Sequence, residues 1–173
     1  MTEFYVFTGE NDDSLTSQAC VAYLILGIVT LQNAHLFLRR PLLSPVIHHS
    51  NHWLLVLNFN QNLLGKCFLA LRRHAESIVD LTTDEWGHLH DQVSRATGML
   101  TAAFRPEHFN YAFLQNQDPH VHLHILPRYA RSISYQGLTF EADFPGPWPA
   151  HPRPLEDGIQ EMLVKRLEAL VNG

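Results

Sequence analysis

The sequence predicts an α+β domain in which an antiparallel β-sheet packs against a long helix and a C-terminal helix. The predicted elements run in the order strands, helix, strands, helix. Short turn-rich segments join the strands, which is typical of hairpins and not of parallel crossovers. The sequence also lacks the glycine-rich phosphate loop that opens doubly wound folds. At 173 residues, the chain has the length of one ordinary domain.

Charge and composition limit the partners that we expect. The formal net charge is -5, which argues against broad attraction to nucleic acid or to anionic lipid. The first residues are acidic and do not resemble a secretory signal, and the longest apolar run, residues 19–31, is shorter than the ~20 residues that span a bilayer. Cys20 and Cys67 form no Cys-x-x-Cys pair. We therefore expect a cytoplasmic protein with no membrane partner and no thiolate metal site.

The first part of the chain predicts one helix and three strands. Possible N-caps at residues 12–14 precede a helix over residues 15–27, and residues 29–40 are more typical of a strand. Residues 42–52 are interpreted as a loop. Residues 53–59 and 66–73 predict two strands that are joined by the turn-rich "NQNLLG" and pair antiparallel.

The clearest helix start lies at Thr82. Thr82 and Glu85 have the spacing of a capping box, and Leu81 and Trp86 stand where a hydrophobic staple would form. This helix is expected to end near residue 100 or 104, before Pro106.

The last part predicts a hairpin, an irregular segment and a helix. Strands over residues 110–116 and 121–127 are separated by the tight "QDP" connection. The prolines of residues 144–154 predict an extended flap or linker. Residues 155–171 predict a helix that packs on the sheet through one apolar face, formed by Ile159, Met162, Leu163, Leu167 and Leu170.

The stretch "DPHVHLHILPRY", residues 118–129, places histidines at every second position. On a strand, His120, His122 and His124 would share one face, while the alternating apolar residues would face the core. A single histidine on a strand is usually a solvated or hydrogen-bonded side chain. Three in alternation favour a chemical role, because buried imidazole nitrogens need partners.

Zinc binding is an alternative role for these histidines, since imidazoles two residues apart on a strand can bind one ion. The first and third would lie ~13 Å apart at their Cα atoms, which is too far for all three to bind one ion with ease. We expect no cofactor. Other residues that were considered are the histidines at 48, 49 and 52, which are interpreted as solvated, and Arg72, Arg73 and Arg105, which could contact polyphosphate.

The motif "HVHLHIL" resembles the signature of the histidine triad superfamily, His-x-His-x-His followed by two apolar residues. The following "PR" is similar to the dinucleoside polyphosphate hydrolase branch. Upstream, "LNFNQNLLGKCFLALRRH" and "LTTDEW" resemble the family's strand, turn and strand and the start of its long helix. The resemblance implies one histidine triad domain over residues 1–173, with an atypical region at 1–51, the core at 52–130, and a proline-rich flap and helix at 131–173.

The resemblance also implies roles for site residues. His122 would be the nucleophile, assisted by His120 and His124, and Asn58 would bind the ribose hydroxyls. The nitrogen of His122 that does not attack is expected to donate to a backbone carbonyl, that of His120. Many members carry a histidine where Lys66 stands. Further candidates for nucleotide binding are Gln115, Gln117 and Arg128.

The function implied is a nucleotide hydrolase or nucleotidyl transferase. It would cleave the α-phosphate bond of dinucleoside polyphosphates or nucleoside phosphoramidates through a nucleotidyl-histidine intermediate and release a nucleoside monophosphate. The resemblance also implies an adenine nucleotide as substrate and a homodimer. Two alternatives remain: a nucleotide-binding or regulatory protein without turnover, and a zinc-dependent hydrolase that uses the same histidines.

Overall fold

The computed structural model describes residues 45–116, 118–147 and 149–173. The helix predicted for residues 15–27, the strand predicted for 29–40, Cys20 and Gln117 therefore lie outside the described residues.

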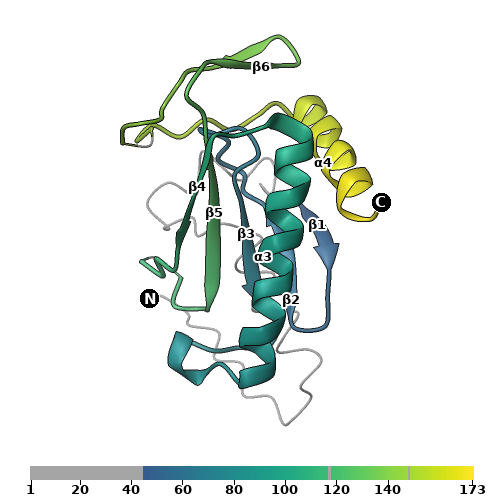
Figure 1. Cartoon of the computed structure of the whole chain (residues 1–173), viewed down its shortest axis with the longest axis vertical. Coiled ribbons are helices and arrows are strands. Elements are labelled where there is room, and N and C mark those ends of the chain that lie inside the picture. Colours follow the sequence, from purple (N-terminus) through teal and green to yellow (C-terminus); the bar gives the residue numbers. More distant parts are fainter. Residues whose placement is uncertain (1–44, 117, 148) are drawn as a thin grey trace, which may run out of the picture.

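A five-stranded antiparallel sheet forms the centre of the described structure (Figure 1). The strand order is β1-β2-β3-β5-β4, so the sheet does not follow the order of the chain. The strands are β1 (Val46–His49), β2 (Trp53–Leu57), β3 (Cys67–Leu71), β4 (His108–Ala112) and β5 (His122–Arg128).

The strands β2 and β3 confirm the predicted antiparallel pair, with Leu55 opposite Leu69. Every residue of both strands is buried. One face of the pair belongs to the main core, and the other carries a smaller apolar cluster of Leu54, Val56, Phe68 and Ala70.

The prediction of a loop over residues 42–52 is wrong for β1. Val46 and Ile47 supply β-branched side chains, and the strand pairs with β2 through an irregular register between Val46 and His48. This short edge strand was missed in the sequence because two of its four residues are histidines, which are not typical of a strand.

The predicted long helix is α3 (Thr83–Phe104), which lies across the sheet in Figure 1. The capping box is confirmed: the Thr82 hydroxyl accepts from the Glu85 backbone, and the Glu85 carboxylate accepts from Thr82 N at 2.8 Å. The helix ends at Phe104, and Arg105 follows in the left-handed conformation at φ 53°. Trp86 lies edge to face with Phe113, at 6.2 Å between ring centroids.

The predicted hairpin is confirmed as the antiparallel pair β4 and β5, but its boundaries differ. The strand β4 begins two residues earlier than predicted, and the connection spans residues 113–121 in place of a tight turn. A second hairpin, β6 (Ile133–Tyr135) and β7 (Leu138–Phe140), was not predicted. Its turn has positive φ at both Gln136 and Gly137.

The C-terminal helix is α4 (Asp157–Val171), and it contacts α3 and β1. Its buried residues are Leu163, Leu167 and Val171, which are spaced four residues apart. The predicted apolar face was therefore only partly right, because Met162 and Leu170 are 42% and 39% exposed. None of the described helices is both long enough and apolar enough to cross a membrane. A short 3-10 helix, η2 (Ile78–Asp80), precedes α3.

The structure makes a prediction about Gly65, which has φ 84° and lies against α3. A Cβ atom there would stand 2.8 Å from Leu100 Cδ2, so Gly65→Ala combines backbone strain with a clash. We expect a loss of about 1–3 kcal/mol in the free energy of unfolding, measured by urea denaturation.

Gly87→Ala is the matched control, because it adds the same methyl group within α3 where nothing lies within 4 Å. We expect this control to stabilise the protein by about 0.5–1 kcal/mol. Equal effects of the two substitutions would contradict the structure around Gly65.

Candidate functional site

Two of the three histidines lie on one strand. His122 and His124 belong to β5, opposite Ala70 and Phe68 of β3, on the face that carries the smaller apolar cluster. Val121, Leu123 and Ile125 enter the main core, as predicted. His120 precedes β5, so the strand alternation that was expected to set all three histidines on one face does not extend to it.

The hydrogen bonds of His122 define its tautomer. Its Nδ1 lies 2.8 Å from the carbonyl oxygen of His120. Because a carbonyl only accepts, Nδ1 carries the proton and donates, and the neutral ring keeps a lone pair on Nε2. This contact is the one that the sequence analysis predicted. The ring is 7% exposed.

His124 donates a hydrogen bond to the unprotonated nitrogen of His122. Its Nε2 lies 3.1 Å from Nε2 of His122. Since that nitrogen of His122 is unprotonated, His124 Nε2 is the donor, and its Nδ1 is then an unprotonated acceptor. The Nδ1 atom of His124 is buried and has no hydrogen-bond partner among the described residues. The Phe68 ring lies against both imidazoles, with centroids 5.9 Å from His122 and 6.1 Å from His124.

His120 is held by the backbone beside β3. Its Nε2 donates to the Leu71 carbonyl at 2.7 Å, and its ring stacks on His74 at 5.6 Å between centroids. Asp118 accepts from the His120 backbone amide, and Val121 N donates to Ala75 O at 2.8 Å. These contacts fix the carbonyl that orients His122.

The environment keeps two of the imidazoles uncharged. Burial lowers the pKa of His124 from 6.5 to about 3, with smaller contributions from His122 and Lys66. Burial also lowers the pKa of His120, although its bond to Leu71 opposes this change. At neutral pH, His120 and His124 can therefore donate hydrogen bonds but add no positive charge to the site.

A small cavity opens beside His124. Its volume is about 70 Å³, far below the roughly 300–1,000 Å³ of pockets that enclose a whole small-molecule ligand. It suits a small polar group better than a nucleoside. The cavity is lined by Asn62, Leu63, Lys66, Leu114, His124 and Leu126.

The loop that supplies Lys66 is organised by Gln61, which sequence reasoning missed. Gln61 is fully buried, donates from Nε2 to the carbonyls of Asn58 and Lys66, and accepts from Gly65 N at 2.8 Å. An isolated glutamine in "NQNLLG" carries no signal of burial, because the same letters describe an exposed turn.

The structure places Asn58 directly after β2, where Asn58 N donates to Lys66 O at 3.0 Å. Its side-chain Oδ1 accepts from Asn60 N at 2.9 Å. The alternation of the strand sets Asn58 on the same sheet face as Val56, the face of His122.

Gln115 and Arg128 are engaged in contacts within the protein. Gln115 donates to the carbonyls of Glu76 and Pro119, at 2.8 and 2.5 Å, and so spans the connection before the triad. Arg128 is buried, forms an ion pair with Asp143 and donates to Asn110 Oδ1 at 2.6 Å. These contacts tie β5 to the proline-rich segment, and they leave the guanidinium little capacity for a nucleotide.

The remaining clusters lie apart from the triad. Arg73 is paired with the Glu85 carboxylate at 2.6 Å, and His48 contacts Asn172. In the part of the chain that the structure describes, no group of three or more His, Cys, Asp or Glu side chains is arranged to hold a metal ion.

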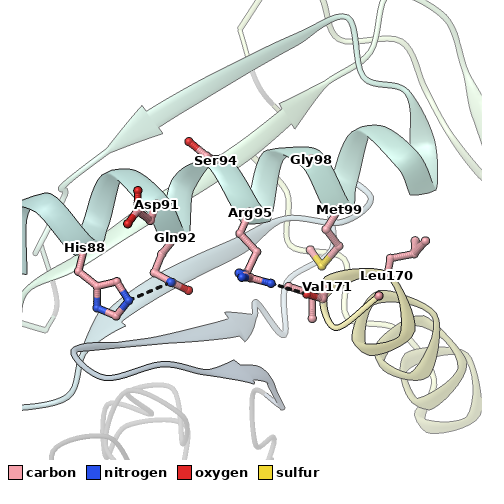
Figure 2. Close-up of a pocket in the computed structure, with 10 residues that line it drawn as sticks. His88, Asp91, Gln92, Ser94, Arg95, Gly98, Met99, Leu170 and Val171 are labelled. Atoms are coloured by element: carbon pink, nitrogen blue, oxygen red, sulfur yellow. Dashed lines mark hydrogen bonds between the residues drawn. The ribbon is translucent and has the colours of Figure 1, made fainter.

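A larger open pocket of about 520 Å³ lies along α3 and the end of α4. Figure 2 shows Gln92 beside His88, and Arg95 donating to the Val171 carbonyl, at this pocket. None of the triad residues lines it.

Comparisons of the sequence with protein-family models and with curated proteins give no match. Solved structures do match. A histidine triad protein from Bradyrhizobium japonicum is 21% identical, with a TM-score of 0.62 over 74% of this chain and 90% of that one. One from Marinobacter aquaeolei VT8 is 23% identical, with a TM-score of 0.61 over 75% and 89%.

A third match is a hypothetical histidine triad nucleotide-binding protein from Sulfolobus tokodaii, which is 16% identical with a TM-score of 0.55. It covers 75% of this chain and 84% of that one. These likenesses agree with the resemblance seen in "HVHLHIL" and with the antiparallel sheet and two helices described above. The chain therefore has the fold of the histidine triad proteins.

Proposed function

We propose that the protein is a nucleotidyl hydrolase that cleaves the α-phosphate bond of a nucleotide through a covalent intermediate on His122. The observation that carries this proposal is the 2.8 Å bond from His122 Nδ1 to the His120 carbonyl. It leaves the lone pair of Nε2 as the nucleophile.

In the first step, His122 Nε2 forms a bond to the α-phosphorus, and the bond from phosphorus to the leaving group breaks. The leaving group departs with the bonding electron pair. The ring becomes a cationic N-phosphoryl imidazole, and the proton on Nδ1 stays hydrogen-bonded to the His120 carbonyl, which stabilises the new charge.

His124 can stabilise the phosphate during this first step. Before substrate binds, its Nε2 proton is donated to His122 Nε2, 3.1 Å away. When that lone pair attacks phosphorus, the same donor is free to turn to a non-bridging phosphate oxygen. The nucleophile is thus held by a donor that stabilises the phosphate during the reaction.

In the second step, a water oxygen bonds to phosphorus and the phosphorus–nitrogen bond breaks. The electron pair returns to His122 Nε2, a nucleoside monophosphate leaves, and one proton of the water is released. Splitting one difficult displacement into two easier ones is the advantage of covalent catalysis.

The structural comparisons support a nucleotide ligand in general terms, since one matched protein is described as nucleotide-binding. A dinucleoside polyphosphate is the preferred substrate by the resemblance of "PR" after the triad. Adenine as the base, a homodimer and a cytoplasmic location stay predictions. Asn58 as ribose ligand also belongs to the proposal, supported by its place on the His122 side of the sheet.

Turnover of diadenosine tetraphosphate and adenosine 5'-phosphoramidate tests the proposal, with release of AMP followed by chromatography. We expect turnover that a chelator leaves unchanged. His122→Asn should lower it by about 10⁴-fold or more, and His124→Ala by about 10²–10³-fold. Exposed His151 provides the control His151→Asn, which should have no effect.

The other outcomes separate the alternatives. Binding of AMP without turnover of either compound would favour a nucleotide-binding protein. Turnover that the chelator abolishes would favour a zinc-dependent hydrolase.

The uncharged histidines also predict how stability depends on pH. Between their usual pKa of 6.5 and the pKa of about 3 for buried His124, the unfolded chain binds protons that the folded protein does not. The free energy of unfolding should therefore fall as pH decreases from 7 to 5, by at most about 1.4 kcal/mol per pH unit for each such group.

Urea denaturation at several pH values measures this slope. His124→Asn should make it shallower, whereas His151→Asn should leave it unchanged. An unchanged slope in the His124 variant would contradict a buried neutral His124.

A further inference from the structure

The proposed reaction needs positive charge that two of the three triad imidazoles do not supply. A phosphate diester carries negative charge, and this charge is not neutralised by the uncharged rings of His120 and His124. A neutral donor forms a weaker hydrogen bond to an anion than a charged donor does. A cation close to His124 would neutralise part of the negative charge of the phosphate.

Lys66 stands in that place. It directly precedes β3, and strand alternation sets it on the same sheet face as Phe68, which lies against both His122 and His124. It lines the cavity beside His124, and it is the one formally charged side chain among the described residues of that lining. Its charge is close enough to lower the pKa of His124.

The ammonium group of Lys66 has no acidic partner among the described residues. Its one hydrogen bond there is a long one, 3.5 Å, to Asn62 Oδ1. Burial alone lowers the pKa of Lys66. A partly buried cation without a counterion is unfavourable in the free protein, and an anionic ligand would remove that cost.

The loop around Lys66 is built to hold this position. Gly65 makes the turn at φ 84°, Gln61 fixes the Lys66 carbonyl at 2.8 Å, and Asn62 Nδ2 donates to the Pro149 carbonyl at 2.6 Å. Asn62 thereby connects the ammonium group to the proline-rich segment. The turn at Gly65 and these two hydrogen bonds place the lysine, and no ion pair with a described residue contributes.

We propose that Lys66 and His124 form a phosphate subsite, in which the ammonium group binds a phosphoryl group of the substrate next to the nucleophile His122. The volume of about 70 Å³ accommodates a phosphoryl group and leaves the nucleoside outside the cavity. The inference rests on the proposed function for the identity of the substrate.

Binding measurements test the subsite without any catalytic turnover. Isothermal titration of the whole protein with AMP, inorganic phosphate and adenosine is compared for Lys66→Met and Lys66→Arg. In Lys66→Met, we expect the affinity for AMP and for phosphate to fall by about 10- to 100-fold, while adenosine binding changes little. Lys66→Arg keeps the charge and should retain most of the affinity.

Lys165→Met is the matched control, because it removes an exposed lysine that pairs with Glu161 at 2.8 Å on α4. It should change none of the three affinities. Equal losses for AMP and adenosine in Lys66→Met would show a structural role for the side chain and overturn the subsite, as would unchanged phosphate affinity.

A measurement on the wild-type protein covers the case in which Lys66→Met does not fold. The acetylation rate of Lys66, followed by peptide mass spectrometry, should fall when inorganic phosphate is added, and that of Lys165 should not. Equal rates with and without phosphate would overturn the subsite. If phosphate protects Lys66 but no nucleotide is turned over, the subsite is supported and the proposed hydrolase activity is rejected. If nucleotides are turned over and Lys66→Met leaves turnover intact, the hydrolase activity is supported and the subsite is rejected.

Discussion

The bond from His122 Nδ1 to the His120 carbonyl is the contact on which the site depends. It selects one tautomer of a neutral ring and so determines which nitrogen can attack. The strand β5 begins at His122, so His120 lies outside the strand. The ring of His120 is held by its hydrogen bond to the Leu71 carbonyl.

The rest of the site follows from the order of the strands. The strand β5 lies between β3 and β4, and Phe68 of β3 lies against the rings of His122 and His124. The helix α3 fills one face, so the chemistry is confined to the other. The loop before β3 then brings Lys66 to the side of His124, and Gln61 keeps that loop closed. One surface thus combines a neutral nucleophile with a nearby cation.

The sequence was sufficient to predict the elements that have strong local patterns. It was insufficient for the elements whose formation depends on contacts between residues distant in the chain. The capping box at Thr82, the β2–β3 pair and the core face of β5 were predicted, because each depends on residues close in sequence. The edge strand β1, the β6–β7 hairpin and the buried position of Gln61 were missed. Each of these is stabilised by partners distant in the chain or by turn geometry that polar letters do not reveal. The Arg128 ion pair with Asp143 likewise has no local signature.

The central claim is that the imidazole of His122 becomes covalently bonded to the nucleotide. Rapid quench of the reaction with a dinucleoside polyphosphate in denaturant at alkaline pH preserves a phosphorus–nitrogen bond to histidine, which acid would hydrolyse. Peptide mass spectrometry of the quenched protein then tests the claim most directly. The account predicts a nucleoside monophosphate adduct on the peptide that contains His122, located at that residue and absent from His122→Asn. Turnover with no adduct on any histidine, or with an adduct on His120 or His124, would contradict the account.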